Sequence, residues 1–176
     1  MSAESALVEE RFRELFVRYH ADVAAYVARR APASLAEEVV EETFVVAWRS
    51  FDRIRGDPLP WLYGVARRTL ANQLRGIERR HRLIQQLASQ PQVPQPEPLS
   101  DLVSPSLRDA LLELSDADRE ALLLIAWEGL TPSQAARVVG CSSPAFRVRL
   151  HRARRRLERV LSLDSPVEPR LNEEQA

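Results

Sequence analysis

The sequence has 176 residues, enough for one ordinary domain or two small ones, and its formal net charge is zero. Its one cysteine, Cys141, excludes a disulfide framework and a cysteine-based zinc site, and its three histidines lack metal-ligand spacing, so no metal or cofactor is expected. No signal peptide is recognisable, and no apolar run approaches the ~18 residues of a membrane span, so we expect a cytoplasmic protein. Five glycines and few bounded runs of β-branched residues favour an all-helical fold.

The N-terminal part is predicted to form two amphipathic helices. Residues 1–8 are expected to be frayed, and apolar residues recur at helical spacing from Glu9 to about Arg30. Ser34, with Glu37 three residues later, has the pattern of a capping box for a second helix that ends near Phe51.

The second helix is predicted to have one buried face and one acidic face. The buried stripe consists of Val40, Phe44, Ala47, Trp48 and Phe51. The opposite face combines glutamates with valines, which is typical of a surface that binds a partner. These valines could equally pack on a neighbouring helix, and the residues alone leave both readings open. The outward residues are Glu38, Val39, Glu42, Val46 and Arg49.

A loop and a basic helix follow. Residues 52–60 are predicted to be a loop because they contain a Gly-Asp-Pro turn, and because prolines 58 and 60 are excluded from a helix interior. The helix expected from Trp61 to about Leu83 carries six Arg against one Glu between Arg67 and Arg82, or +5. Such a stripe is typical of a surface that binds a nucleic-acid strand, although Trp61 alone is more typical of half-buried packing. Its polar face consists of Trp61, Arg68, Asn72, Arg75 and Arg79.

The middle of the chain is predicted to be a spacer followed by short helices. Residues 89–105 contain five prolines and no apolar period, so we expect an extended, semi-rigid linker. Helices are expected over residues 106–114 and 118–128. After Leu163 the tail is expected to be disordered.

Residues 131–159 have the pattern of a helix-turn-helix. Thr131-Pro132 and Ser143-Pro144 are helix starts, and Gly140 supplies the turn between them. The second helix has an apolar face and an arginine-rich face, with seven Arg against one Glu between Arg147 and Arg159. Self-repulsion of that charge favours an anionic partner over an ordinary surface helix, so we expect this helix to enter a DNA major groove.

Several of these segments resemble the sigma factors of bacterial RNA polymerase. The run RLHRAR at 149–154, the acidic segment AEEVVEETFVVAW at 36–48 and WLY at 61–63 are similar to the small extracytoplasmic-function (ECF) class. The resemblance implies two small all-α domains. Region 2 would span residues 9–86, a Pro-rich linker 87–105, the region 4 helix-turn-helix domain 106–163, and a disordered tail 164–176.

The resemblance also implies a function. The protein would not be an enzyme but an exchangeable subunit that recognises promoters and initiates transcription. Its acidic helix would bind the clamp helices of the polymerase largest subunit, and the flap region would be a further polymerase contact. Region 2 would hold the melted −10 element with one flipped base, and region 4 would read the −35 duplex. An anti-sigma protein would be a further partner.

The site residues that this implies lie on the polar faces described above. The core polymerase contacts are Glu38, Val39, Glu41, Glu42, Val46 and Arg49. The −10 contacts are Arg53, Arg55, Gly56, Asp57, Trp61, Arg68, Asn72, Arg75 and Arg79. The −35 contacts are Ser143, Pro144, Arg147, Val148, His151, Arg152 and Arg155. The chain departs from the family at Arg68 and Asn72, which make the −10 face more positive, and at Val148, which can touch a thymine methyl.

Two other functions compete with this interpretation. An autonomous helix-turn-helix transcriptional regulator would explain residues 131–159 but neither the acidic helix nor the basic helix. A nuclease would need a cluster of carboxylates or histidines for a metal, whereas the carboxylates here lie at helix starts and on one acidic face.

Overall fold

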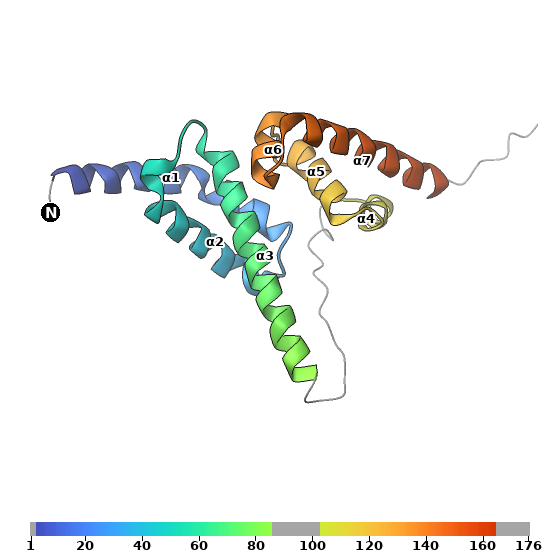
Figure 1. Ribbon diagram of the computed structural model, residues 1–176, viewed down its shortest axis with the longest axis horizontal. Helices are drawn as coiled ribbons and strands as arrows, with labels where there is room; N and C mark the ends of the chain where they lie inside the picture. The colour runs from blue at the N-terminus through green and yellow to red at the C-terminus, as the bar shows by residue number, and fades with distance from the viewer. Residues whose placement is uncertain (1–2, 86–102, 165–176) are drawn as a thin grey trace, which may run out of the picture.

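The computed structural model describes residues 3–85 and 103–164, and in these ranges it contains seven α-helices, one 3₁₀ helix and no strand (Figure 1). The N-terminal unit consists of α1 (Ala3–Ala28), α2 (Ala33–Arg49) and α3 (Pro58–Gln85), with η1 (Phe51–Arg53) before α3. The C-terminal unit consists of α4 (Pro105–Leu112), α5 (Asp116–Ala126), α6 (Pro132–Val139) and α7 (Ser143–Asp164). The all-α prediction is confirmed, whereas most of the predicted linker and tail lies outside the described residues. None of the described helices is long and apolar enough to cross a membrane.

The N-terminal unit is built around α2, which packs against both α1 and α3. The apolar stripes of the three helices meet in one core, as their periodicity predicts. Tyr26 of α1 and Tyr63 of α3 stack within it at 4.6 Å between ring centroids. The most completely buried side chains of this core are Val23, Tyr26, Val27, Val39, Ala47, Leu62 and Ala66.

Three helix starts differ from the predictions. Helix α1 begins at Ala3 and not at Glu9, because Ala, Glu and Leu in its first turns are strong helix formers. Helix α2 begins at Ala33, so Ser34 lies inside it and makes no cap. Helix α3 begins at Pro58 and includes Pro60, because amide groups in the first helical turn have no helical acceptor to lose.

The predicted helix-turn-helix is confirmed in the C-terminal unit. The Thr131 hydroxyl accepts a hydrogen bond from the Gln134 amide at the start of α6, and the Gln134 side chain accepts one in return from the Thr131 amide. Gly140 ends α6 with φ of 76°, a left-handed conformation that favours glycine. Phe146, Leu150 and Ala153 form the buried face of α7, which packs against α4, α5 and α6. Helices α4 and α5 start slightly earlier than predicted, after the capping residues Ser104 and Ser115.

The two units contact each other in a way that the sequence analysis does not predict. Helix α6 packs against the N-terminal half of α3, while the C-terminal half of α3 extends away from the C-terminal unit (Figure 1). Beside this contact, Arg29 and Arg30 form ion pairs with Glu120 and Glu128. We call these four side chains the Arg–Glu cluster. They join the C-terminal end of α1 to α5 and to the turn after α5.

A first prediction concerns the glycine that ends α6. Gly140→Ala is expected to lower the free energy of unfolding by about 1–2 kcal/mol, because a Cβ is strained at this φ. Gly76→Ala is the matched control. Gly76 lies inside α3, where an added Cβ would come no nearer than 4.0 Å to the Arg79 guanidinium, so alanine should stabilise the fold by up to about 1 kcal/mol. Urea unfolding of both variants checks this, and equal effects would contradict it.

Candidate functional site

The outer face of α2 is acidic and exposed to solvent. Glu38, Glu41, Glu42 and Arg49 are exposed, and Val46 is half-buried. The Glu42 carboxylate accepts a hydrogen bond of 3.3 Å from the Gln73 side-chain amide, which connects this face to α3. The remaining glutamates are free to meet a positively charged partner. We call this surface the acidic α2 face.

Val39 is a correction to the predicted face. Its side chain is 0% exposed, whereas the prediction placed it among the partner-binding residues. At about 100° per residue, Val39 lies a quarter-turn from Glu38 and turns into the core formed with α1 and α3. Val45 lies close to the centre of the acidic face and is 45% exposed, although the sequence analysis did not select it. Projection of residues 38–49 on a helical wheel would have found it.

Trp48 is a second correction on α2. The prediction placed it in the buried stripe, but it is 44% exposed. Its ring makes a T-shaped contact with Phe12 of α1, with 5.0 Å between centroids. A ring at the last turn of a helix has fewer neighbours to cover it. Trp48 and Val45 together add apolar area to the acidic α2 face.

The basic face of α3 is largely open. Arg68, Asn72, Arg75 and Arg79 are exposed, and Trp61 at the start of the helix is half-buried against the core. The packing interpretation of Trp61 therefore holds for much of its ring. The Asn72 side-chain oxygen accepts a hydrogen bond from Arg75, which aligns these two side chains along the helix. We call these five residues the basic α3 face.

The loop before α3 has the predicted turn, but one residue there has other partners. Arg53, Arg55, Gly56 and Asp57 are exposed, and Gly56 has φ of 70°. One oxygen of Asp57 accepts a hydrogen bond of 3.2 Å from the Leu59 amide, as a cap of α3 would. Its other oxygen accepts one of 2.9 Å from the Gln134 side chain of α6. Asp57 thus binds the C-terminal unit in this arrangement.

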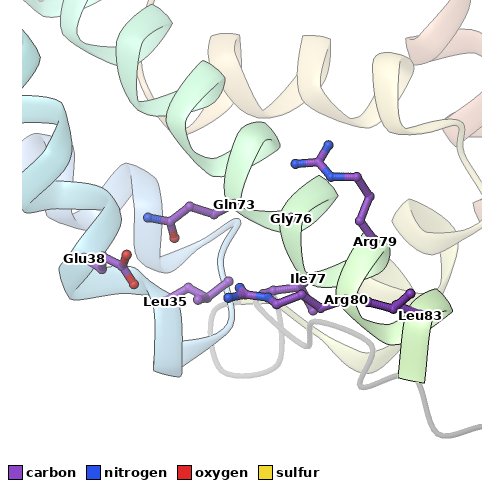
Figure 2. A pocket seen from close by; sticks show the side chains of 8 residues that line it. All are labelled: Leu35, Glu38, Gln73, Gly76, Ile77, Arg79, Arg80 and Leu83. Carbon is purple, nitrogen blue, oxygen red and sulfur yellow. The ribbon is translucent and has the colours of Figure 1, made fainter. Parts of the chain in front are cut away.

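A groove of about 440 Å³ separates the acidic α2 face from the end of the basic α3 face (Figure 2). Leu35, Ile77 and Leu83 provide its apolar lining, while Glu38 contributes from α2 and Gln73 from α3. Figure 2 shows Arg80 reaching across toward Leu35, whereas Arg79 points away from the groove. The side-chain oxygen of Gln73 is buried without a hydrogen-bond partner.

The outer face of α7 is exposed along its length. Pro144, Arg147, Val148, His151, Arg152 and Arg155 are all exposed, as predicted, and Ser143 is half-buried beside Ser133 of α6. Val148 is 51% exposed and places an apolar group among the arginines. We call this surface the outer α7 face. Its charge, shape and position after α6 suit a duplex groove.

Arg156 differs from the other arginines of α7. It donates a hydrogen bond to the Asp118 carboxylate, whose side chain is only 10% exposed at the first turn of α5. Arg156 thus compensates a buried charge and ties α7 to α5. The sequence gives little signal for this role, because Arg155 and Arg156 differ only in their angle around the helix.

Comparison with known proteins matches both units. The family described as sigma-70 region 2 matches residues 15–80, and the family described as sigma-70, region 4 matches residues 105–157. The RNA polymerase sigma factor CarQ of Myxococcus xanthus is 32% identical, over 87% of this chain and 90% of CarQ. The chain belongs to the sigma-70 family, in its extracytoplasmic-function class. It therefore serves as a sigma factor, which directs bacterial RNA polymerase to promoters and initiates transcription.

Other relatives agree with this assignment. The ECF RNA polymerase sigma-E factor of Escherichia coli K12 is 29% identical over 92% of this chain and 88% of that protein. The sigma factor RpoE of Bartonella quintana, solved in complex with the anti-sigma factor NepR, has the same fold. Its TM-score is 0.67 at 24% identity, over 89% of this chain and 99% of that one.

The family matches cover both units of this sigma factor. The α1–α3 unit corresponds to region 2 and the α4–α7 unit to region 4. An autonomous helix-turn-helix regulator would leave the matched region 2 without a role. Among the described residues, no group of three or more His, Cys, Asp or Glu is arranged to hold a metal.

A second prediction separates two neighbouring arginines of region 4. Arg156→Ala is expected to lower the free energy of unfolding by about 1–3 kcal/mol, because the buried Asp118 carboxylate loses its partner. Arg155→Ala should change stability by less than about 0.5 kcal/mol, because Arg155 is exposed, and should instead weaken binding to duplex DNA. Chemical denaturation and a DNA-binding titration of both variants test this. Equal stability losses would contradict it.

Proposed function

We propose that the three exposed faces divide promoter recognition among them. The acidic α2 face docks on core polymerase, the basic α3 face holds the melted −10 strand, and the outer α7 face reads the −35 duplex. The observation that carries this proposal is the exposure of Asn72, Arg75 and Arg79 on α3. A protein that binds only duplex DNA through its helix-turn-helix would not need this second basic helix. The protein itself catalyses no reaction and acts in the cytoplasm, where its polymerase works.

The acidic α2 face suits a positively charged helical partner. Glu38 and Glu41 are exposed and have no ion pair among the described residues, so their charge is available. Val45 and Trp48 add apolar contact area at the same surface. Apolar residues surrounded by charges are typical of a protein-binding site, because the charges steer the encounter and the apolar area strengthens the contact. The clamp helices of the largest polymerase subunit are the proposed partner.

The basic α3 face suits a single strand. Guanidinium groups spaced along one helix can contact successive phosphates of a strand. At the start of α3, Trp61 provides an aromatic ring and the Arg53–Asp57 loop provides a turn, and these could hold a base that has left the DNA base stack. Each phosphate contact steepens the salt dependence of binding to a single strand by ~0.7 in log–log terms. Arg68, Arg75 and Arg79 should therefore contribute measurably to the affinity for the strand and to its salt dependence.

The outer α7 face suits the −35 duplex. Arg147, Arg152 and Arg155 can reach phosphates or base edges, and Val148 can contact a thymine methyl. Because the Thr131 cap and Gly140 fix the angle between α6 and α7, the α7 side chains enter a groove as one unit. An anti-sigma protein is a proposed further partner, in keeping with the Bartonella quintana complex.

The polymerase assignment predicts the effect of charge reversal on α2. The Glu38→Arg, Glu42→Arg double variant is expected to bind core polymerase at least tenfold more weakly, because two attractive contacts become repulsive. Glu9→Arg, Glu14→Arg is the control, since it makes the same charge change on exposed positions of α1. Co-purification and a binding titration with core polymerase measure both. Equal affinity of the two variants would place the docking surface elsewhere.

The strand-capture assignment predicts a separation of duplex binding from melting. The Arg68→Gln, Arg75→Gln, Arg79→Gln variant, with core polymerase, should bind the −35 duplex normally but lose at least tenfold in strand opening. Permanganate reactivity of unpaired thymines measures opening. The control replaces Arg13, Arg108 and Arg159 with Gln and should open the promoter normally, because these arginines lie outside the basic α3 face and the loop before it. Full thymine reactivity in the α3 variant would remove this face from the mechanism.

A further inference from the structure

A groove lies between α1 and the loop that precedes α3. Its volume is about 370 Å³, which falls within the range of about 300–1,000 Å³ that small-molecule sites have. Helix α1 forms one wall, while η1, the loop and the first residue of α3 form the other. None of the three faces described above includes the α1 wall. We call this feature the α1 groove, and the lining residues that matter here are Arg11, Glu14, Arg18, Tyr19, Phe51 and Gly56.

The α1 wall follows from the helical spacing of its residues. Arg11, Glu14, Leu15, Arg18 and Tyr19 occupy positions i, i+3, i+4, i+7 and i+8, which lie on one face of a helix. Leu15 is buried and Tyr19 is half-buried against the core, so the polar members of the series remain at the surface. Seven residues separate the two arginines, which is roughly 10 Å along the helix axis. Two long side chains at this spacing can reach the phosphates on the two sides of one nucleotide.

Both arginines of the groove are held in place without being neutralised. The guanidinium carbon of Arg11 lies 5.5 Å from the centre of the Phe51 ring, and that of Arg18 lies 5.4 Å from the centre of the Tyr19 ring. A guanidinium that lies over a ring keeps its N–H edge free for an anion. Neither arginine has an ion pair in the described parts of the chain, whereas Arg13 of the same helix is paired with a glutamate. Their charge is therefore available to phosphates.

The remaining lining suits a base. Tyr19 and Phe51 are half-buried, so part of each ring is open, and aromatic rings bind the bases of single strands by stacking. At Gly56 no atom lies within 4 Å of the point where a Cβ would stand, so a ligand can approach the backbone closely there. Glu14, between the two arginines in the sequence, disfavours a phosphate beside it but can accept a hydrogen bond from a base N–H.

We propose that the α1 groove binds one nucleotide of the melted −10 strand, with the flanking phosphates at Arg11 and Arg18 and the base against Tyr19 and Phe51. This inference rests on the −10 role proposed for α3 and its loop, and it adds α1 as a further element that holds the strand. A base must leave the duplex before it can enter such a groove, so the site is open to an unpaired strand and closed to a duplex.

The first test removes the two charges of the groove. Arg11→Gln, Arg18→Gln in the full-length protein should bind a short fluorescent single strand of mixed sequence about fivefold more weakly or worse, and the salt dependence should fall by ~0.7 for each lost phosphate contact. The control is Arg13→Gln, Arg108→Gln, which removes the same charge from α1 and α4 outside the groove. Circular dichroism checks that both variants keep their helices. Equal affinities of the two variants would overturn the inference.

A cross-linking test needs no substitution. Single strands that contain 5-iododeoxyuridine are irradiated in complex with the parent protein, because this base cross-links to aromatic rings that it touches. Mass spectrometry should find the cross-link on Tyr19 or Phe51. Cross-links confined to other aromatic residues, such as Trp61, would overturn the inference. A free nucleoside monophosphate should not compete with the strand at equal concentration, and equal competition would make the groove a mononucleotide site instead.

Arg79→Gln separates this inference from the proposed function. Arg79 is exposed on the basic α3 face and does not line the α1 groove, so its loss should weaken strand binding independently. If Arg79→Gln weakens strand binding but Arg11→Gln, Arg18→Gln does not, only the inference about the groove fails. If neither variant weakens it, the −10 assignment itself fails.

Core polymerase distinguishes a strand from a protein as the occupant of the groove. Arg11→Gln, Arg18→Gln should bind core polymerase with the parent's affinity, and the resulting holoenzyme should show at least about fivefold lower permanganate reactivity of unpaired thymines on a promoter. The Arg13→Gln, Arg108→Gln control should match the parent in both measurements. Weaker binding to core polymerase, together with unchanged binding to the single strand, would assign the groove to a polymerase contact and overturn the inference.

Discussion

Arg30 and Glu128 bring opposite charges together in a place almost closed to water, and the relative position of the two sigma regions depends on this contact. The buried apolar residues of the two regions belong to one cluster, and α6 packs directly against α3. The ion pairs add a directional constraint, because the Arg30 guanidinium must meet Glu120 and Glu128 at once. Such pairs fix one geometry at a cost in desolvation, whereas an apolar contact would tolerate sliding. The result is one defined arrangement of the two regions.

The zero net charge of the chain conceals a division of charge among surfaces. Glutamates gather on the outer face of α2, while arginines gather on α3 and α7. Because charges of one sign on one face repel, each face is more stable when it meets a partner of the other sign. The same pairing of opposite charges occurs inside the molecule, where Arg29 and Arg30 form ion pairs with Glu120 and Glu128. Internal contacts and the proposed external contacts thus depend on the same type of interaction.

The sequence predicted those features that local chemistry determines. The Thr131 cap, the Gly140 turn and the apolar face of α7 each follow from a few neighbouring residues, and all three are present. One local prediction failed, since Ser34 lies inside α2 and makes no cap, and the other errors arose where tertiary packing decides. Val39 is buried because α2 is covered on two sides, and Trp48 is exposed because the end of α2 is not. The Arg–Glu cluster could not be foreseen, since no local pattern pairs Arg30 with residues some 90 to 98 positions away.

Ionic strength should act unequally on the exposed and the buried charges of this protein. Phosphate contacts on an exposed face lose affinity steeply with salt, through counterion release. The Arg–Glu cluster is largely buried, so mobile ions screen it much less. Added salt should therefore weaken strand binding by the basic α3 face more than it weakens the ion pairs between the two units.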